Sequence, residues 1–307
     1  MIRESVVRAF SHAALSPDPD LAVAALMIAR IEYPRLDSGP YLDLLDALGR
    51  EAKRRVDEAS LVVSNVARDA PLHVDPESYA RVMALNDYLF GELRFVGNDM
   101  QYEDPRNSFL NEVLDRRTGI PITLAVIYIE VARRAGVHVE GINFPGHFLV
   151  RCPARRGLGR MEDLIIDAHH GGALLSADAC LTMYRKHAET GPDVPIPEAR
   201  LFARAAKPQI MKRMLLNLKQ VYVAMHSFPQ ARDVTELMLA VDPSALSELR
   251  DRGLLAYQLN DFSGALRDLQ AYLRLSAKGE AGSETRQEHD QIWEHVKTLR
   301  KRVASLN

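Results

Sequence analysis

The chain has 307 residues and a formal net charge of −2, with 47% hydrophobic and 26% charged residues. This length allows two or three domains with a large core, and the near-neutral charge gives no indication of binding to nucleic acid or an anionic membrane. Two cysteines are too few for a disulfide framework or a cysteine-rich zinc site. The apolar run at 21–29 is too short to span a bilayer and follows acidic residues. We therefore expect a cytoplasmic protein with reduced thiols and with no nucleic-acid or membrane partner.

Residues 1–95 are predicted to form a helical N-terminal extension. Apolar periodicity indicates helices at 21–32, 41–56 and 76–93, separated by proline and glycine. Because no cluster of catalytic residue types occurs in this block, we expect it to support packing.

Residues 96–190 form the central module, which is predicted to be α+β. Its centre is an apolar helix with residues at the helical period, namely Leu124, Ile127, Tyr128 and Val131. The intervening residues are also apolar, so this helix should be buried on nearly all sides. Thr118 is the expected N-cap, which places Pro121 in the first turn, where a missing N–H costs little.

Three strand-like runs follow this helix, at 137–144, 146–152 and 164–168, and they predict a small antiparallel sheet against it. A shorter helix at 109–116 should precede the buried one, capped by Asn107 or Ser108. Ser176 should open a further helix that ends near residue 187. The proline-rich stretch 191–197 is the expected domain boundary.

Residues 200–307 contain a repeat with a spacing of 34 residues. The pairs that share this offset include Phe228 with Phe262 and Ala231 with Ala265. A helix–turn–helix period of 34 residues is typical of tetratricopeptide repeats. A charged last helix carries apolar residues on one face and should cap the stack; these residues are Ile292, Val296, Leu299 and Val303.

The run YEDPRNSFLNEVLDRRTGIPITLAVIYIEVARRAGVHVEGINFPGHFLVR, with a short strand ending at Asp167, resembles the transglutaminase-like core of the bacterial SirB family. That family joins such a core to C-terminal tetratricopeptide repeats, and the resemblance covers about residues 21–275. It implies a papain-like fold. Enzymes with this fold use a cysteine that opens the buried helix, a histidine on the next strand and an aspartate on the one after.

Laid on this sequence, the pattern puts His147 and Asp167 at the histidine and aspartate positions, and Pro121 at the position of the nucleophile. The chemistry needs a thiolate at the helix N-terminus, an imidazole that takes its proton and a carboxylate that fixes the imidazole tautomer. Proline supplies no nucleophile. The sequence therefore favours a non-catalytic protein that acts as an interaction or regulatory module.

Other residues are weaker candidates for a nucleophile. Cys152 is five residues after His147, so in an extended strand it should face the opposite side. Cys180 falls in a later helix, and both thiols are expected to be core residues. Thr123, in the first turn of the buried helix, remains open as a binding residue or substitute nucleophile near His147.

A metal site is a further alternative. Asp167 and His169 are two residues apart, so in an extended segment they would share a face while His170 pointed away. With His147 they would form a two-histidine, one-carboxylate set. Because two glycines follow at once and would end the extended geometry, we expect neither a metal nor another cofactor. The alternative function is a hydrolase or acyltransferase on amide or ester bonds, using His147 and Asp167 with Thr123, water or a metal.

Arg106, Asn107 and Asn111 match the DPRNS-x-LN pattern of the family that the chain resembles. We expect them to cap and tie the helices, and a role in substrate binding stays open. The concave surface of the repeats is the expected site for a protein or peptide partner.

Overall fold

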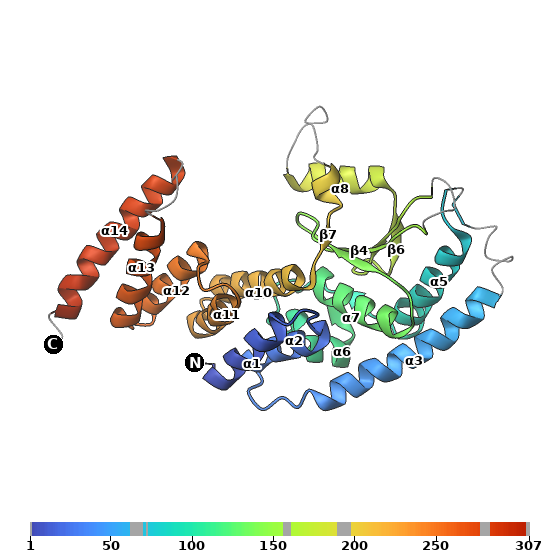
Figure 1. The fold of residues 1–307 in the computed structure, drawn as a ribbon, viewed down its shortest axis with the longest axis horizontal. Coiled ribbons are helices and arrows are strands. Elements are labelled where there is room, and N and C mark those ends of the chain that lie inside the picture. Colours follow the sequence, from blue (N-terminus) through green and yellow to red (C-terminus); the bar gives the residue numbers. More distant parts are fainter. Residues whose placement is uncertain are drawn as a thin grey trace. The chain divides into compact units, whose positions relative to one another are not determined.

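The computed structural model describes residues 2–61, 70–71, 73–155, 161–188, 198–276 and 283–304 (Figure 1). Its contacts separate two compact units. The core unit consists of Pro19–Ala29 and Arg35–Met214, and the repeat unit consists of Met1–Asp18, Arg30–Pro34 and Leu215–Asn307. The boundaries expected from the sequence, 1–95, 96–190 and 200–307, stay a prediction, and the proline-rich stretch 191–197 lies outside the described residues.

The core unit combines helices with two small sheets. Its helices are α2 (Leu21–Ile28), α3 (Gly39–Leu61), α5 (Pro76–Asn86), the π-helical η2 (Asp87–Glu92), the 3-10 turn η3 (Pro105–Ser108), α6 (Leu110–Arg116), α7 (Pro121–Arg134), α8 (Ala177–Ala188), α9 (Glu198–Leu201) and the first part of α10 (Lys207–Ala224). The 3-10 turn η1 (Ala29–Ile31) follows α2 directly. The strands are β1 (Val96–Gly97), β2 (Thr118–Gly119), β3 (Glu140–Ile142), β4 (Leu149–Cys152), β5 (Leu164–Asp167), β6 (Ala173–Leu175) and β7 (Arg204–Ala205).

The larger sheet has the order β6-β5-β4-β3-β7, and every neighbouring pair is antiparallel. α7 lies on one side of this sheet and α8 on the other (Figure 1). On the α8 side, Leu149 of β4 and Ile165 of β5 pack in an apolar cluster with Cys180 and Leu201. The α+β fold with a buried helix against a small antiparallel sheet, predicted from the sequence, is therefore confirmed.

The first eight residues of α7 are all buried, which agrees with its apolar sequence on every face. α7 also packs along α3, where Gly49 leaves room for Arg134; a Cβ on Gly49 would lie 2.8 Å from Cδ of Arg134. Arg134 pairs with Asp46 of α3 at 2.6 Å and with the buried Glu130 of its own helix. The central helix is thus fixed by packing and by an ion pair at its basic end.

The beginnings of two core helices differ from the sequence prediction. α7 is preceded by Ile120 as its N-cap, because Thr118 instead belongs to β2 and pairs in parallel with Val96. α6 begins after Phe109, because residues 105–108 form a 3-10 turn of their own that Asp104 caps. Thr118, Asn107 and Ser108 were therefore wrong as helix caps. Pro121 occupies the first turn of α7, as expected.

The repeat unit is helical throughout its described residues. Its helices are α1 (Glu4–Ala14), the later part of α10, α11 (Phe228–Val241), α12 (Leu246–Gln258), α13 (Phe262–Ser276) and α14 (Ser283–Ala304). α1 was not anticipated from the sequence. It packs against α11 through Val6, Phe10 and Ala14, and the hydroxyl of Ser11 donates a hydrogen bond to the carbonyl of Ala240 at 2.8 Å.

The 34-residue spacing appears in the backbone as a repeated turn. His226 and Asn260 are 34 residues apart and both have positive φ, 57° and 60°. After each, the next N–H reaches back five residues: Ser227 to Tyr222 at 2.8 Å and Asp261 to Ala256 at 2.9 Å. This left-handed ending of a helix is the Schellman type. The repeat seen in the sequence is therefore two helical hairpins of the same construction.

α14 packs on α13 as the predicted cap. Ile292, Val296 and Leu299 are buried in the same apolar cluster as Leu269 and Tyr272. The side chain of Val303 lies outside the described part of the chain. None of the helices in the described ranges has the length and apolar character needed to cross a membrane.

Candidate functional site

Asp167, the last residue of β5, is the centre of the candidate site and is only 1% exposed. Its Oδ1 accepts the backbone N–H groups of His169, at 3.0 Å, and His170, at 3.3 Å. The chain turns directly after the strand, and Gly171 and Gly172 supply the positive φ angles, 66° and 77°, that this turn needs. Aspartate side chains commonly stabilise such turns by accepting nearby backbone N–H groups.

Two imidazoles reach the same carboxylate. Nε2 of His147 lies 2.9 Å from both Asp167 oxygens, and Nδ1 of His170 lies 2.8 Å from Oδ2. Burial alone would raise the pKa of Asp167, but the bonds and charges of His147 and His170 outweigh it and lower this pKa to about 2. Asp167 is therefore an ionised carboxylate at neutral pH. The geometry brings the two triad-equivalent residues together, while their role stays a prediction.

His147 lies in the turn before β4 rather than within the strand. Its N–H donates to the carbonyl of Phe144 at 3.1 Å, across the turn at Pro145 and Gly146. The alternation used to compare His147 with Cys152 therefore does not extend to residue 147, because that residue is not part of the extended strand.

The extended geometry considered for the two consecutive histidines is not present, as the following glycines suggested. His170, expected to point away, contacts Asp167, while His169 instead bonds Oδ1 of Asp99 through Nε2 at 2.8 Å. The cause is the turn at residues 168–172. In a turn the residue at i+3 returns to the side of residue i, so the two-residue alternation of a strand no longer applies.

His169 is held in place by close packing. A Cβ on Gly97 would lie 2.5 Å from its Nδ1, so glycine at this position of β1 is what makes room for the ring. Burial lowers the pKa of His169, against the opposing bond to Asp99. Its Nδ1 is buried and has no hydrogen-bond partner among the described residues. Sequence reasoning missed both Gly97 and Asp99, because no strand or helix period marks this short irregular segment.

These residues form one connected group, which we call the histidine cluster: Asp99, His147, Asp167, His169 and His170. The ring centroids of the three histidines are 5.0 to 5.8 Å apart. Two sets within the cluster have nitrogen and oxygen atoms within 4.8 Å of one another, namely His147, Asp167 and His170, and Asp99, His169 and His170. Such a group can hold and exchange protons, or it can ligate a divalent cation.

No sulfur nucleophile belongs to this cluster. Pro121 occupies the start of α7. Cys152 and Cys180 are both buried and free, and burial raises the pKa of each thiol to about 11, with the charge of Asp167 adding to the effect for Cys180. Thr123 is fully buried, and within the described residues its hydroxyl has no hydrogen-bond partner, so it is not hydrogen-bonded to His147.

The residues of the DPRNS segment connect the loop before η3 to the start of α7. Asn107 is fully buried; its amide donates to the carbonyl of Gln101 at 2.7 Å and accepts from Asn98 at 3.2 Å. Its backbone carbonyl accepts from the N–H of Ile120 at 3.4 Å. Asn107 thereby ties the loop that carries Asp99 to the first turn of α7.

The other two residues of the DPRNS-x-LN pattern, Arg106 and Asn111, make different contacts from those of Asn107. Arg106 pairs with Asp104 and is about half exposed. Asn111 is buried, and its Oδ1 has no hydrogen-bond partner in the described part of the chain. A binding role for Arg106, Asn107, Asn111 and Thr123 stays a prediction.

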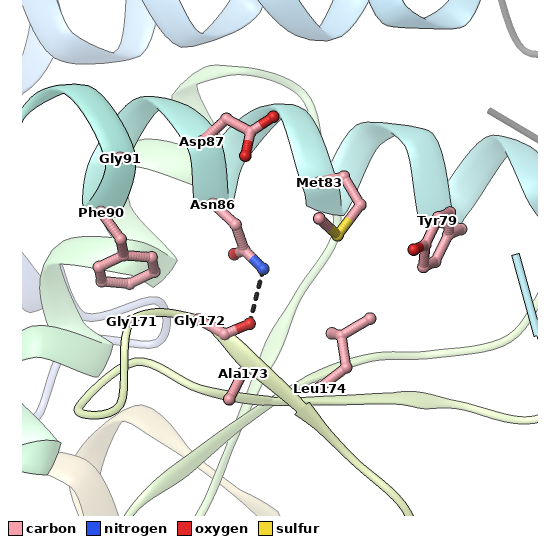
Figure 2. A pocket seen from close by; sticks show the side chains of 10 residues that line it. All are labelled: Tyr79, Met83, Asn86, Asp87, Phe90, Gly91, Gly171, Gly172, Ala173 and Leu174. Carbon is pink, nitrogen blue, oxygen red and sulfur yellow. Dashed lines mark hydrogen bonds between the residues drawn. The ribbon is translucent and has the colours of Figure 1, made fainter. Parts of the chain in front are cut away.

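A pocket of about 550 Å³ lies beside Gly171 and Gly172 of the turn after β5 (Figure 2). Its lining comes from α5, η2 and the start of β6: Tyr79, Met83, Asn86, Asp87, Phe90, Gly91, Gly171, Gly172, Ala173 and Leu174. The amide of Asn86 donates to the carbonyl of Gly172 at 2.7 Å, so α5 holds the turn from the pocket side (Figure 2).

Residues 40–216 match the model of the transglutaminase-like superfamily, and residues 218–296 match a tetratricopeptide repeat model. A UPF0162 protein of Xylella fastidiosa is 38% identical over 281 residues, which cover 90% of this chain and 91% of that protein. A UPF0162 protein of Pseudomonas aeruginosa is 28% identical over 258 residues, which cover 84% of this chain and 85% of that protein. Human F-box only protein 21 is 31% identical over 200 residues, 63% of this chain but 30% of that protein.

The first family model covers the part of the chain with the buried helix and the sheet, and the second covers the helical hairpins that follow it. The Xylella relative matches across both parts. The chain therefore belongs to the UPF0162 proteins of the transglutaminase-like superfamily.

Proposed function

We propose that this protein is a non-catalytic member of its superfamily, a pseudoenzyme that acts in the cytoplasm as a protein-interaction and regulatory module. The observation that carries the proposal is Pro121 in the first turn of α7, where the triad of active relatives would need a thiol. The long core motif also leads us to assign the chain to the SirB family within this group.

The state of the two cysteines supports the non-catalytic proposal. A nucleophilic thiol needs a lowered pKa and access to substrate. Cys152 and Cys180 have the opposite properties, burial and a pKa raised to about 11. Neither makes a good thiolate at neutral pH.

To test the non-catalytic assignment, the protein is incubated with activated esters and primary amines. The assay is then repeated after Cys152 and Cys180 have been alkylated in the unfolded state and the protein has been refolded. We expect no turnover above background, and native Cys152 and Cys180 should react with a thiol reagent much more slowly than free cysteine because the thiolate is disfavoured and covered. Turnover that alkylation abolishes, or a stable thioester, would contradict the proposal.

The interaction role rests on the repeat unit. Tetratricopeptide helices stack into a surface that commonly binds peptides or protein segments. The exposed large apolar side chains of this unit include Val223, Met225 and Leu246. Exposed apolar groups on a helical repeat are suited to contact with a protein partner.

The interaction role is tested by cross-linking the full-length protein in its native cytoplasm and identifying the linked proteins by mass spectrometry. Val223→Ser, Met225→Ser and Leu246→Ser combined should remove the cross-links to a specific partner. Leu61→Ser, which changes an even more exposed apolar residue of the core unit, is the control and should keep them. Loss of the partner only in the Leu61 variant would place binding on the core and contradict the assignment.

A further inference from the structure

The set formed by His147, Asp167 and His170 has the composition of a metal site. It offers two imidazole nitrogens and one carboxylate, the ligands that divalent transition metals such as zinc, cobalt and nickel accept. The fold brings together Asp167 at the end of β5, His170 in the turn after it and His147 before β4, so this set could not be recognised from the chain order alone.

The spacing of the ligand atoms fits one ion. Nε2 of His147 and Nδ1 of His170 lie 2.9 Å and 2.8 Å from Asp167 oxygens, and the three ligand atoms are within 4.8 Å of one another. Metal–ligand bonds of about 2.1 Å place neighbouring ligand atoms about 3 Å apart in octahedral geometry and about 3.4 Å apart in the tetrahedral geometry of zinc. An ion can therefore replace the protons now shared between the carboxylate and the rings with only small movements of the side chains.

Burial and access are also suitable. Asp167 is buried and the side chain of His147 is only 11% exposed, which protects a bound ion from competing water, whereas the side chain of His170 is 57% exposed. The exposed edge provides a path for the ion to enter and leaves coordination positions open to water or another small ligand.

The surroundings hold the set in position. The backbone N–H groups of His169 and His170 fix the Asp167 carboxylate, and the amide of Asn86 fixes the carbonyl of Gly172 in the same turn. Metal sites generally depend on such outer contacts to orient their ligands. The centroid of the His169 ring lies 5.0 Å from that of His170. Its Nδ1 is buried and has no hydrogen-bond partner among the described residues. This is a polar atom whose burial the protein fold alone does not explain.

We propose that His147, Asp167 and His170 bind one divalent transition-metal ion, with the buried ring of His169 packed beside His170. The proposal is independent of the interaction role of the repeat unit, because it concerns the core unit only.

The test is isothermal titration of the untagged, chelator-treated full-length protein with Zn²⁺. We expect one ion per chain, and His170→Ala should weaken binding by about tenfold or more, since even residues that only orient ligands contribute this much. The matched control is His73→Ala, which removes an exposed histidine of the same unit that is outside the cluster. His73→Ala should bind as the unchanged protein does. No saturable binding, or equal binding by the His170 variant and the unchanged protein, would overturn the proposal.

A second pair of variants decides between the two sets in the cluster. Asp99 is 75% exposed, so Asp99→Asn should fold and keep Zn²⁺ affinity within about threefold. His147→Ala should lose affinity as His170→Ala does, and both should weaken the visible absorption that Co²⁺ gains when protein ligands replace part of its water shell. If Asp99→Asn removes binding and His147→Ala leaves it unchanged, the ion belongs to the other set and the proposal is wrong.

Discussion

Asp167 in the core unit and Asp268 in the repeat unit are both deeply buried carboxylates, but their partners differ. Asp268, on α13, is bonded through both oxygens to Arg252 of α12, at 2.7 Å and 2.9 Å. Arg252 also bonds Glu236 of α11 at 2.8 Å, which ties three successive helices together. Asp167 has two imidazoles in place of the guanidinium.

The two carboxylates differ in whether their partner can change its charge or be replaced by another ligand. A guanidinium stays charged and donates in a fixed, two-pronged geometry, so the Arg252–Asp268 pair is a permanent link. An imidazole can lose its proton or give its place to a metal, and one of the two rings at Asp167 is half exposed. We infer that a buried carboxylate paired with arginine supports structure, whereas one paired with two histidines, one of them accessible, is available to a ligand.

The largest effect is expected for Arg252→Met, which leaves Asp268 buried without its main partner. Loss of one member of a buried ion pair costs about 3 kcal/mol or more. The single tryptophan, Trp293, lies on α14 of the repeat unit, so its fluorescence during urea denaturation reports on this unit.

Arg267→Met provides the control for that measurement. Arg267 also approaches Asp268, at 3.4 Å, but its side chain is 68% exposed. An exposed pair contributes about 0–1 kcal/mol, so this variant should unfold at nearly the same urea concentration as the unchanged protein. Equal effects of the two substitutions would mean that the Arg252 pair is not the permanent link we infer.

A smaller effect is expected for Gly97→Ala. This variant tests whether displacing the ring of His169 destabilises the core unit as much as losing Arg252 destabilises the repeat unit. The new Cβ would lie 2.5 Å from Nδ1 of His169, so the ring must move away from Asp99. We expect a loss of about 1–3 kcal/mol, typical of overpacking, in the urea dependence of hydrogen exchange in core peptides.

Two further variants complete that test. His169→Ala in the Gly97→Ala background should recover most of the loss, because the clash disappears. Gly91→Ala is the control, since a Cβ there meets no described atom within 4 Å. A double variant no more stable than Gly97→Ala alone would show that the strain does not come from the ring.

The smallest effect is expected for His170→Ala in the presence of a chelator. Asp167 would keep His147 and two backbone donors, and the removed side chain is largely exposed, so the core should lose less than about 1 kcal/mol. The same hydrogen-exchange measurement applies. A loss as large as that of Arg252→Met would show that His170 is structural and would remove the contrast between the two carboxylates.

Several features of this protein were determined by the sequence itself. The apolar residues on every face of α7 indicated burial on nearly all sides, and the 34-residue offset indicated repeated hairpins with turns such as those at His226 and Asn260. The pairing of His147 with Asp167 was also anticipated, from the position of each in a resemblance to a known core. Each of these rests on a period or a motif within the chain.

The tertiary structure alone decided the rest. Whether His169 or His170 faces Asp167 depends on where β5 ends, and the turn at Gly171 and Gly172 reverses the alternation that a strand would give. Asp99 joins the cluster only because β1 pairs with β2 and places Gly97 under the ring of His169. A sequence period describes one element at a time, whereas these contacts arise where irregular segments from distant parts of the chain meet.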